Sequence, residues 1–117
     1  MRKTRPISWI KAARKDFEAF PEAVQEDVLS ALTIMAEGSM PGTAKPLKGF
    51  AEGVHEISIR FRGDAFRVVQ ALKIGPDIFV IHAFQKKSRS GIKTPGHEIE
   101  LVRQRLKRLK ESLGNGR

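Results

Sequence analysis

The feature that most constrains this fold is a run of alternating side chains interrupted by very short turns. Apolar and polar residues alternate from Glu56 to Phe61, which is the pattern of a strand with one buried face. The following residues predict a turn at 62–65 (RGDA), a strand at 66–74 (FRVVQALKI), a turn at 75–77 (GPD) and a strand at 78–84 (IFVIHAF). Turns this short cannot hold the crossover that parallel neighbours need. The segment is therefore predicted to be an antiparallel three-strand meander.

Helical periodicity flanks the meander. Residues 11–20 are compatible with a helix, and Pro21 suits the first turn of a second one. This second helix is predicted to end near Gly38 and to bury Val24, Val28, Ala31, Leu32 and Met35. After the meander, Thr94 and Pro95 are expected to cap and begin a last helix, which ends near Gly114. Its predicted buried stripe is Ile99, Val102, Leu106, Leu109 and Leu113.

The remaining segments complete an α+β domain. Residues 7–10 fit either an N-terminal edge strand or the lead into a helix, and the glycines and prolines of 38–53 predict a loop anchored by Leu47 and Phe50. A chain of 117 residues is expected to form one domain, spanning 1–117. We expect the helices to pack against one face of a small antiparallel sheet and to leave the other face for function.

Composition excludes several classes of site. The chain has no cysteine, and its three histidines are too scattered to suggest a metal site. No apolar run approaches the roughly 20 residues of a membrane span, so a cytoplasmic protein is expected. The acids do not have metal-ligand spacing, and no glycine-rich phosphate cradle or nucleophilic serine motif is present. If the chain is an enzyme, metal-free phosphoryl chemistry without a cofactor is the class that remains.

The charge is high and unevenly distributed. The formal net charge is +9; residues 1–15 carry six cations and no acid, whereas residues 16–44 carry six acids and no cation. Such a basic surface predicts a polyanionic partner, with nucleic acid first and an acidic protein second. A surface that only keeps the protein in solution is the alternative.

Basic side chains gather on the predicted sheet and in the loop that follows it. If the apolar residues of the first two strands face the helices, Arg60 and Arg67 emerge together on the other face, where a phosphodiester would offset their repulsion. The alternative is that Arg60 pairs with Glu56 or Asp64 while Arg67 extends to solvent. Further cations follow the third strand, at Lys86, Lys87, Arg89 and Lys93, and this loop leads into a helix N-terminus that attracts anions. A solvated charge run is the alternative for the loop.

His82 has an ordinary pKa close to neutrality, so it could exchange a proton during catalysis. A lone histidine in an apolar strand is also a common structural residue. Both interpretations stay open at the level of sequence.

The order of these parts resembles the RelE/ParE superfamily of toxins from type II toxin–antitoxin modules, and within it the phage-derived, HigB-like branch. The resemblance runs from Trp9 to Leu109 and includes GVHEISIRFRGDAFRVVQAL and IFVIHAFQKKSRSGIKTPGHEIELVRQRL. Its most specific residues are Glu56 with Arg60, the triplet Phe66, Arg67 and Val68, and Phe84 with Lys86, Lys87, Thr94 and Pro95.

The resemblance implies a ribosome-dependent mRNA endonuclease that needs no metal and is held inactive by a cognate antitoxin, often a helix-turn-helix protein. It assigns Arg67 to transition-state charge, and Lys86 and Lys87 to phosphate binding, one of them donating a proton if its cationic neighbours lower its pKa. Further cations are expected to bind RNA or phosphate: Arg60, Lys45, Lys48, Arg89 and Lys93.

One departure from the family pattern bears on activity. Several superfamily nucleases have an active-site tyrosine, but this chain contains none, and Phe66 stands where a tyrosine often precedes the arginine. The general base is therefore unassigned, with His82 as a candidate. The runner-up function is a ParE-like toxin that inhibits DNA gyrase without nuclease chemistry, and a third is a nucleic-acid-binding accessory protein. Cleavage requires Arg67 on an uncovered face near the lysines, so an Arg67 paired with an acid beneath the helices would contradict it.

Overall fold

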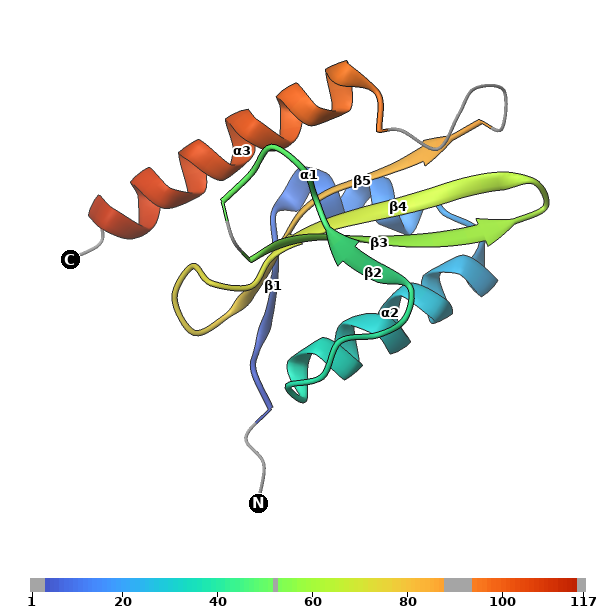
Figure 1. Ribbon diagram of the computed structural model, residues 1–117, viewed down its shortest axis with the longest axis horizontal. Coiled ribbons are helices and arrows are strands. Elements are labelled where there is room, and N and C mark those ends of the chain that lie inside the picture. Colours follow the sequence, from blue (N-terminus) through green and yellow to red (C-terminus); the bar gives the residue numbers. More distant parts are fainter. Residues whose placement is uncertain (1–3, 52, 88–93, 116–117) are drawn as a thin grey trace.

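The computed structural model describes residues 4–51, 53–87 and 94–115 (Figure 1). The elements in chain order are β1 (Ile7–Trp9), α1 (Lys11–Glu18), α2 (Glu22–Ala36), β2 (Ala44–Pro46), β3 (Val54–Phe61), β4 (Asp64–Ala71), β5 (Ile78–Lys86) and α3 (Gly96–Asn115). The α+β class is confirmed. Each helix among the described residues is too short or too polar to span a lipid bilayer.

The strands form one five-stranded sheet in the order β1-β5-β4-β3-β2. The predicted meander is confirmed, because β3 pairs antiparallel with β4 and β4 with β5. Its first turn contains only Arg62 and Gly63, with φ angles of 52° and 86°, which is the mirror-image turn that suits a two-residue hairpin. The edge strand at 7–9 also forms, but it runs parallel to β5. Part of the expected loop at 38–53 is instead β2, paired antiparallel with β3.

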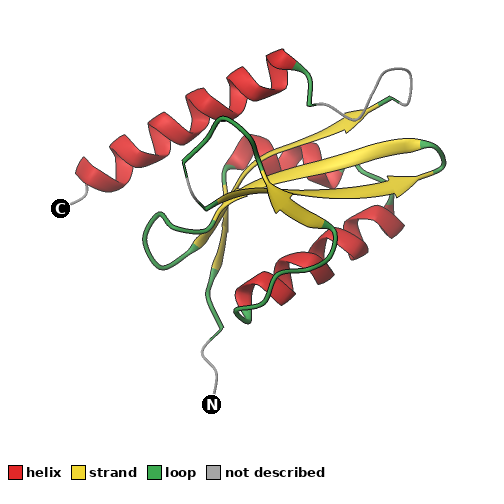
Figure 2. Cartoon of the chain, viewed as in Figure 1, coloured by secondary structure: helices red, strands yellow, loops and turns green. Residues whose placement is uncertain are grey.

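Helices cover both faces of the sheet, so the expectation that all of them share one face is wrong (Figure 2). On one face α1 and α2 pack against residues such as Ile57 and Val68. On the other face Val102 and Leu106 of α3 pack against Val69 and other apolar side chains of the meander. The β4 sequence is apolar toward both sides over part of its length, which is typical of a strand that is covered on both faces.

The predicted stripe on α2 is confirmed, since Val24, Val28, Ala31, Leu32 and Met35 are all buried. The stripe on α3 is confirmed only in its middle. Val102 and Leu106 are buried, but Leu113 is 41 % exposed, because the C-terminal part of α3 extends past the sheet (Figure 1). We call the side of the sheet against which α3 packs the α3 face. The helix covers the apolar half of this face.

Candidate functional site

The polar half of the α3 face is built by the strand register. Side chains that are directly opposite one another on neighbouring strands point to the same side of a sheet. The register gives three such rows across β3, β4 and β5: Glu56, Val69 and His82; Ser58, Arg67 and Phe84; Arg60, Ala65 and Lys86. The sequence-based prediction that Arg60 and Arg67 share a face is therefore confirmed, and Lys86 shares it with them.

Arg67 is not on an uncovered surface, however. It is 5 % exposed, and its Nη1 lies 3.5 Å from Oε1 of Glu56, which is 1 % exposed. Thr94, at the entry to α3, contacts both: Arg67 Nη1 donates to Thr94 Oγ1 at 3.0 Å, and Thr94 Oγ1 donates to Glu56 Oε2 at 3.0 Å. The expected open arrangement of Arg67, and the alternative in which it extends to solvent, are both wrong. The condition set for cleavage, an Arg67 on an uncovered face, is therefore not met in this structure, and chemistry at Arg67 requires Thr94 to leave its two contacts.

Lys86 lies on the same face and is 9 % exposed. Burial lowers the pKa of its ammonium below the ordinary 10.5, the charges of Arg67 and Arg60 lower it further, and Glu56 acts in the opposite direction. Lys86 is in register with Arg60 and projects on the same side of the sheet as Arg67, so the three cations form one electrostatic group. The direction is the one expected for a lysine that donates a proton.

Lys87 is placed differently from Lys86. Its side chain is 70 % exposed, and its Nζ lies 3.7 Å from Oδ2 of Asp64 at the end of the β3–β4 turn. Gln85 donates to the same Asp64 oxygen at 2.8 Å. Since Glu56 pairs with Arg67 and Asp64 with Lys87, the two carboxylates that were alternatives for Arg60 contact other cations. Arg60 is exposed and makes a long contact of 3.4 Å to the carbonyl of Gly63.

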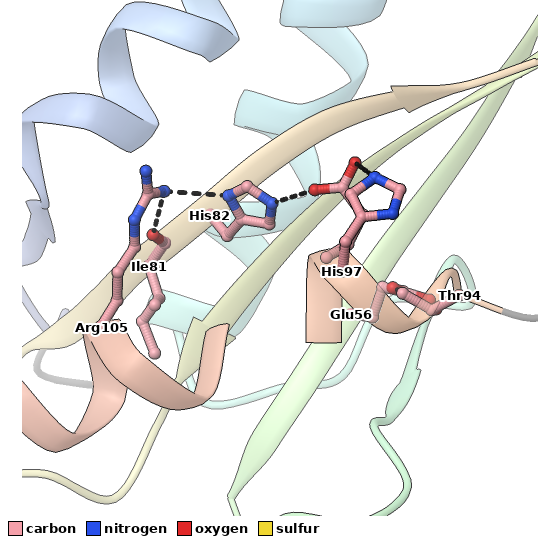
Figure 3. Close-up of polar contacts among 7 residues, drawn as sticks. Glu56, Ile81, His82, Thr94, His97 and Arg105 are labelled. Atoms are coloured by element: carbon pink, nitrogen blue, oxygen red, sulfur yellow. Dashed lines mark hydrogen bonds and ion pairs between the residues drawn. The ribbon is translucent and has the colours of Figure 1, made fainter. Parts of the chain in front are cut away.

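His82 is held by residues of α3 on both sides of its ring (Figure 3). Arg105 Nη1 lies 2.9 Å from Nδ1, and Glu98 Oε1 lies 2.7 Å from Nε2. A guanidinium can only donate, so Nδ1 accepts and Nε2 carries the proton that is donated to Glu98. Both nitrogens are occupied in a side chain that is 3 % exposed, which supports the structural interpretation of His82. Its contacts fix α3 on the sheet.

The other predicted RNA-binding cations lie farther out. Lys45 is exposed on β2 directly opposite Glu56, so it borders the α3 face, and Lys48 is exposed in the following loop. Arg89 and Lys93 lie outside the described residues. Within the part of the chain that the structure describes, no three His, Asp or Glu side chains are grouped so that they could hold a metal ion.

Sequence reasoning missed the network made by Glu56 and Thr94. Glu56 was considered as a partner of Arg60, and Thr94 as a helix cap. In the structure α3 begins at Gly96, and the carbonyl of Pro95 accepts the N–H groups of Glu98 and Ile99. The available signal was the resemblance itself, whose most specific residues include both Glu56 and Thr94.

Residues 15–107 match the family described as phage-derived protein Gp49-like (DUF891). The chain belongs to this family. No curated protein is similar enough to the chain to count as a match. The expected RelE-like fold is confirmed, because solved structures of RelE toxins share the architecture of this Gp49-like chain.

Two of these structures are from E. coli. A free arginine-to-alanine double mutant of the toxin RelE is 18 % identical, with a TM-score of 0.57 over 90 % of this chain and 97 % of that one. The isolated RelE toxin is 19 % identical, with a TM-score of 0.57 over 86 % and 97 %. The RelB–RelE antitoxin–toxin complex from Methanococcus jannaschii is 15 % identical, with a TM-score of 0.50 over 66 % and 87 %. At these identities the likeness establishes the fold.

Proposed function

We propose that this chain is the toxin of a type II toxin–antitoxin module and that it stops translation by cutting mRNA on the ribosome without a metal ion. Membership of the Gp49-like family and the RelE fold support the toxin role. A cognate antitoxin is proposed as its partner, since the relative from M. jannaschii is in complex with the antitoxin RelB. We also propose that the antitoxin is a helix-turn-helix protein, that the chain belongs to the HigB-like branch, and that it acts in the cytoplasm.

The observation that carries the proposal is the convergence of Arg60, Arg67 and Lys86 on the α3 face, from three adjacent strands. Like charges on neighbouring strands destabilise a sheet. Burial is the largest cause of the lowered pKa of Lys86, and the charges of Arg67 and Arg60 lower this pKa further. A bound phosphate group would replace the repulsion among these cations with attraction, because guanidinium and ammonium groups bind phosphate oxygens through charge-assisted hydrogen bonds.

We propose that these residues carry out transfer of a phosphoryl group within RNA. The ribose 2′-oxygen attacks the adjacent phosphorus while the bond from phosphorus to the 5′-oxygen breaks, which yields a 2′,3′-cyclic phosphate and a 5′-hydroxyl. We assign Glu56, the carboxylate that contacts Arg67, as the general base that takes the proton of the 2′-hydroxyl. Lys86 gives a proton to the leaving 5′-oxygen. Arg67 and Arg60 stabilise the negative charge that develops on the phosphorane.

One observation favours a second candidate. Arg67 and Glu56 are covered in this structure, whereas Arg60, Lys45 and Lys48 are exposed. A ParE-like toxin that binds DNA gyrase needs only an exposed surface and no proton transfer. Gyrase inhibition is therefore the alternative that the experiment must separate from RNA cleavage.

The test is to map the 5′ ends of messages after brief expression and in a translating extract, for the parent protein and two matched variants. Lys86→Ala should reduce cutting by about 10²-fold or more, the cost of removing one preorganised charge. Lys15→Ala removes the same charge from an exposed position on α1, across the sheet, and should cut normally. Uncut message together with double-strand breaks in DNA would establish gyrase inhibition instead. Cutting that survives Lys86→Ala would refute the assigned site.

A further inference from the structure

The hydroxyl group of Thr94, at the entry to α3, makes two hydrogen bonds to side chains of the sheet. It accepts from Arg67 Nη1 at 3.0 Å and donates its one proton to Glu56 Oε2 at 3.0 Å. Both partners are almost fully buried, and both belong to the sheet and not to α3. The hydroxyl thus lies between a carboxylate and a guanidinium and is hydrogen-bonded to both.

The start of α3 does not depend on this hydroxyl. The carbonyl of Pro95 accepts the N–H groups of Glu98 and Ile99, and the helix is anchored through His82 by Glu98 and Arg105. Thr94 itself is partly exposed. Its side chain can therefore leave Glu56 and Arg67 while α3 stays on the sheet.

A ribose 2′-hydroxyl is the same chemical group as the threonine hydroxyl: a secondary alcohol with one donor and two acceptor lone pairs. In the proposed cleavage, the attacking 2′-hydroxyl must donate to the general base and lie within reach of a cation. Thr94 makes these two contacts with Glu56 and Arg67, at distances that suit proton transfer. We propose that the position of the Thr94 hydroxyl is the subsite for the attacking 2′-hydroxyl of RNA, and that Thr94 fills this subsite until substrate replaces it. This inference rests on the proposed RNA cleavage.

The subsite gives the protein a way to distinguish RNA from DNA. A ribonucleotide that displaces Thr94 restores both hydrogen bonds. A deoxyribonucleotide has no 2′-hydroxyl. If it displaced Thr94, Glu56 and Arg67 would stay buried and would lose their hydrogen bonds to the Thr94 hydroxyl, which is costly for buried polar groups. Only RNA can therefore take over this position, and DNA leaves Thr94 in it.

The test measures binding of a short ribo-oligonucleotide and of the deoxyribo-oligonucleotide of the same sequence, by fluorescence anisotropy at one salt concentration. Thr94→Ala removes the competing hydroxyl and should tighten RNA binding on the order of tenfold, the worth of a charge-assisted hydrogen bond. DNA binding should stay unchanged, because DNA does not displace the residue at position 94 in either protein. Thr94→Val, which also lacks the hydroxyl but leaves no cavity, should change binding in the same direction. Thr94→Ser keeps the hydroxyl and should match the parent protein.

Weaker RNA binding in Thr94→Ala, or an equal change for RNA and DNA, would overturn the subsite and make Thr94 a residue that only orients Glu56 and Arg67. Message cutting by the same proteins separates this from the proposed function. If the parent cuts message but the variants show no gain in RNA preference, the subsite is refuted and cleavage stands. If the variants gain RNA preference but none of the proteins cuts message, cleavage is refuted while the hydroxyl subsite is supported.

Discussion

Replacing Arg67 with methionine should destabilise the protein strongly, because it leaves the carboxylate of Glu56 buried without its cation. Glu56 is 1 % exposed and cannot regain water without local unfolding. Removing one partner of a buried ion pair costs about 3–5 kcal/mol. The Thr94 hydroxyl would still donate to Glu56, so we expect the lower end, about 3 kcal/mol. At roughly 4 °C per kcal/mol for a domain near this size, the melting temperature should fall by on the order of 12 °C.

A double-mutant cycle measured by urea unfolding and calorimetry tests this value. Arg67→Met combined with Glu56→Met removes both charges from the interior and should recover most of the loss, since apolar replacements of buried pairs are often neutral. The control is the exposed pair of Arg14 and Glu18, joined at 3.2 Å with side chains 63 % and 57 % exposed. Arg14→Met should cost no more than about 0.5 kcal/mol.

The reasoning is refuted if Arg67→Met costs under about 1 kcal/mol, or if the double variant is no more stable than Arg67→Met alone. The result also decides how activity is measured. A loss of cutting in any Arg67 variant is informative only at a temperature where that variant is folded.

Further predictions concern the other polar residues of the site and the core. His82→Phe removes the hydrogen bonds to Glu98 and Arg105 and should lower the free energy of unfolding in urea by about 2–3 kcal/mol, with cutting retained below the melting transition. The control His97→Ala, at a side chain that is 79 % exposed, should cost under about 0.5 kcal/mol. A larger cost for His97→Ala than for His82→Phe would show that His82 is not structural. Because folding lowers the pKa of Lys86 below its ordinary 10.5, the ammonium loses its proton at a lower pH, and RNA binding should decline with rising pH before pH 10.5 is reached. Lys86→Arg stays charged and should move this decline to higher pH. Identical pH profiles of RNA binding for the two proteins would exclude Lys86 as the titrating group. Lys87→Ala breaks a surface ion pair and should change stability by less than about 1 kcal/mol; a larger loss would show that the contact with Asp64 matters to the fold. Leu32→Ala in the fully buried stripe of α2 should cost about 2–5 kcal/mol, and a smaller cost would mean that the core collapses around the cavity.

Local patterns predicted the parts of the fold that depend on neighbours in sequence. Alternation between Glu56 and Phe61 gave the strand and its faces, and the apolar spacing from Val24 to Met35 gave the buried side of α2. The parallel pairing of β1 with β5 and the addition of β2 were missed or left open. Strands of three residues carry too little periodicity to show which partner they choose.

The candidate site divides in the same way. The sequence alone predicted that Arg60 and Arg67 share a face, because side chains alternate along a strand and the apolar residues of both strands were expected to face the helices. It also determined that this face is basic. Only the tertiary structure decided that α3 crosses that face, that Glu56 and Thr94 enclose Arg67, and that His82 is bound by Glu98 and Arg105. These contacts join residues from 11 to 38 positions apart, and they form where the packing of α3 on the sheet removes water from charged groups, which no local pattern records.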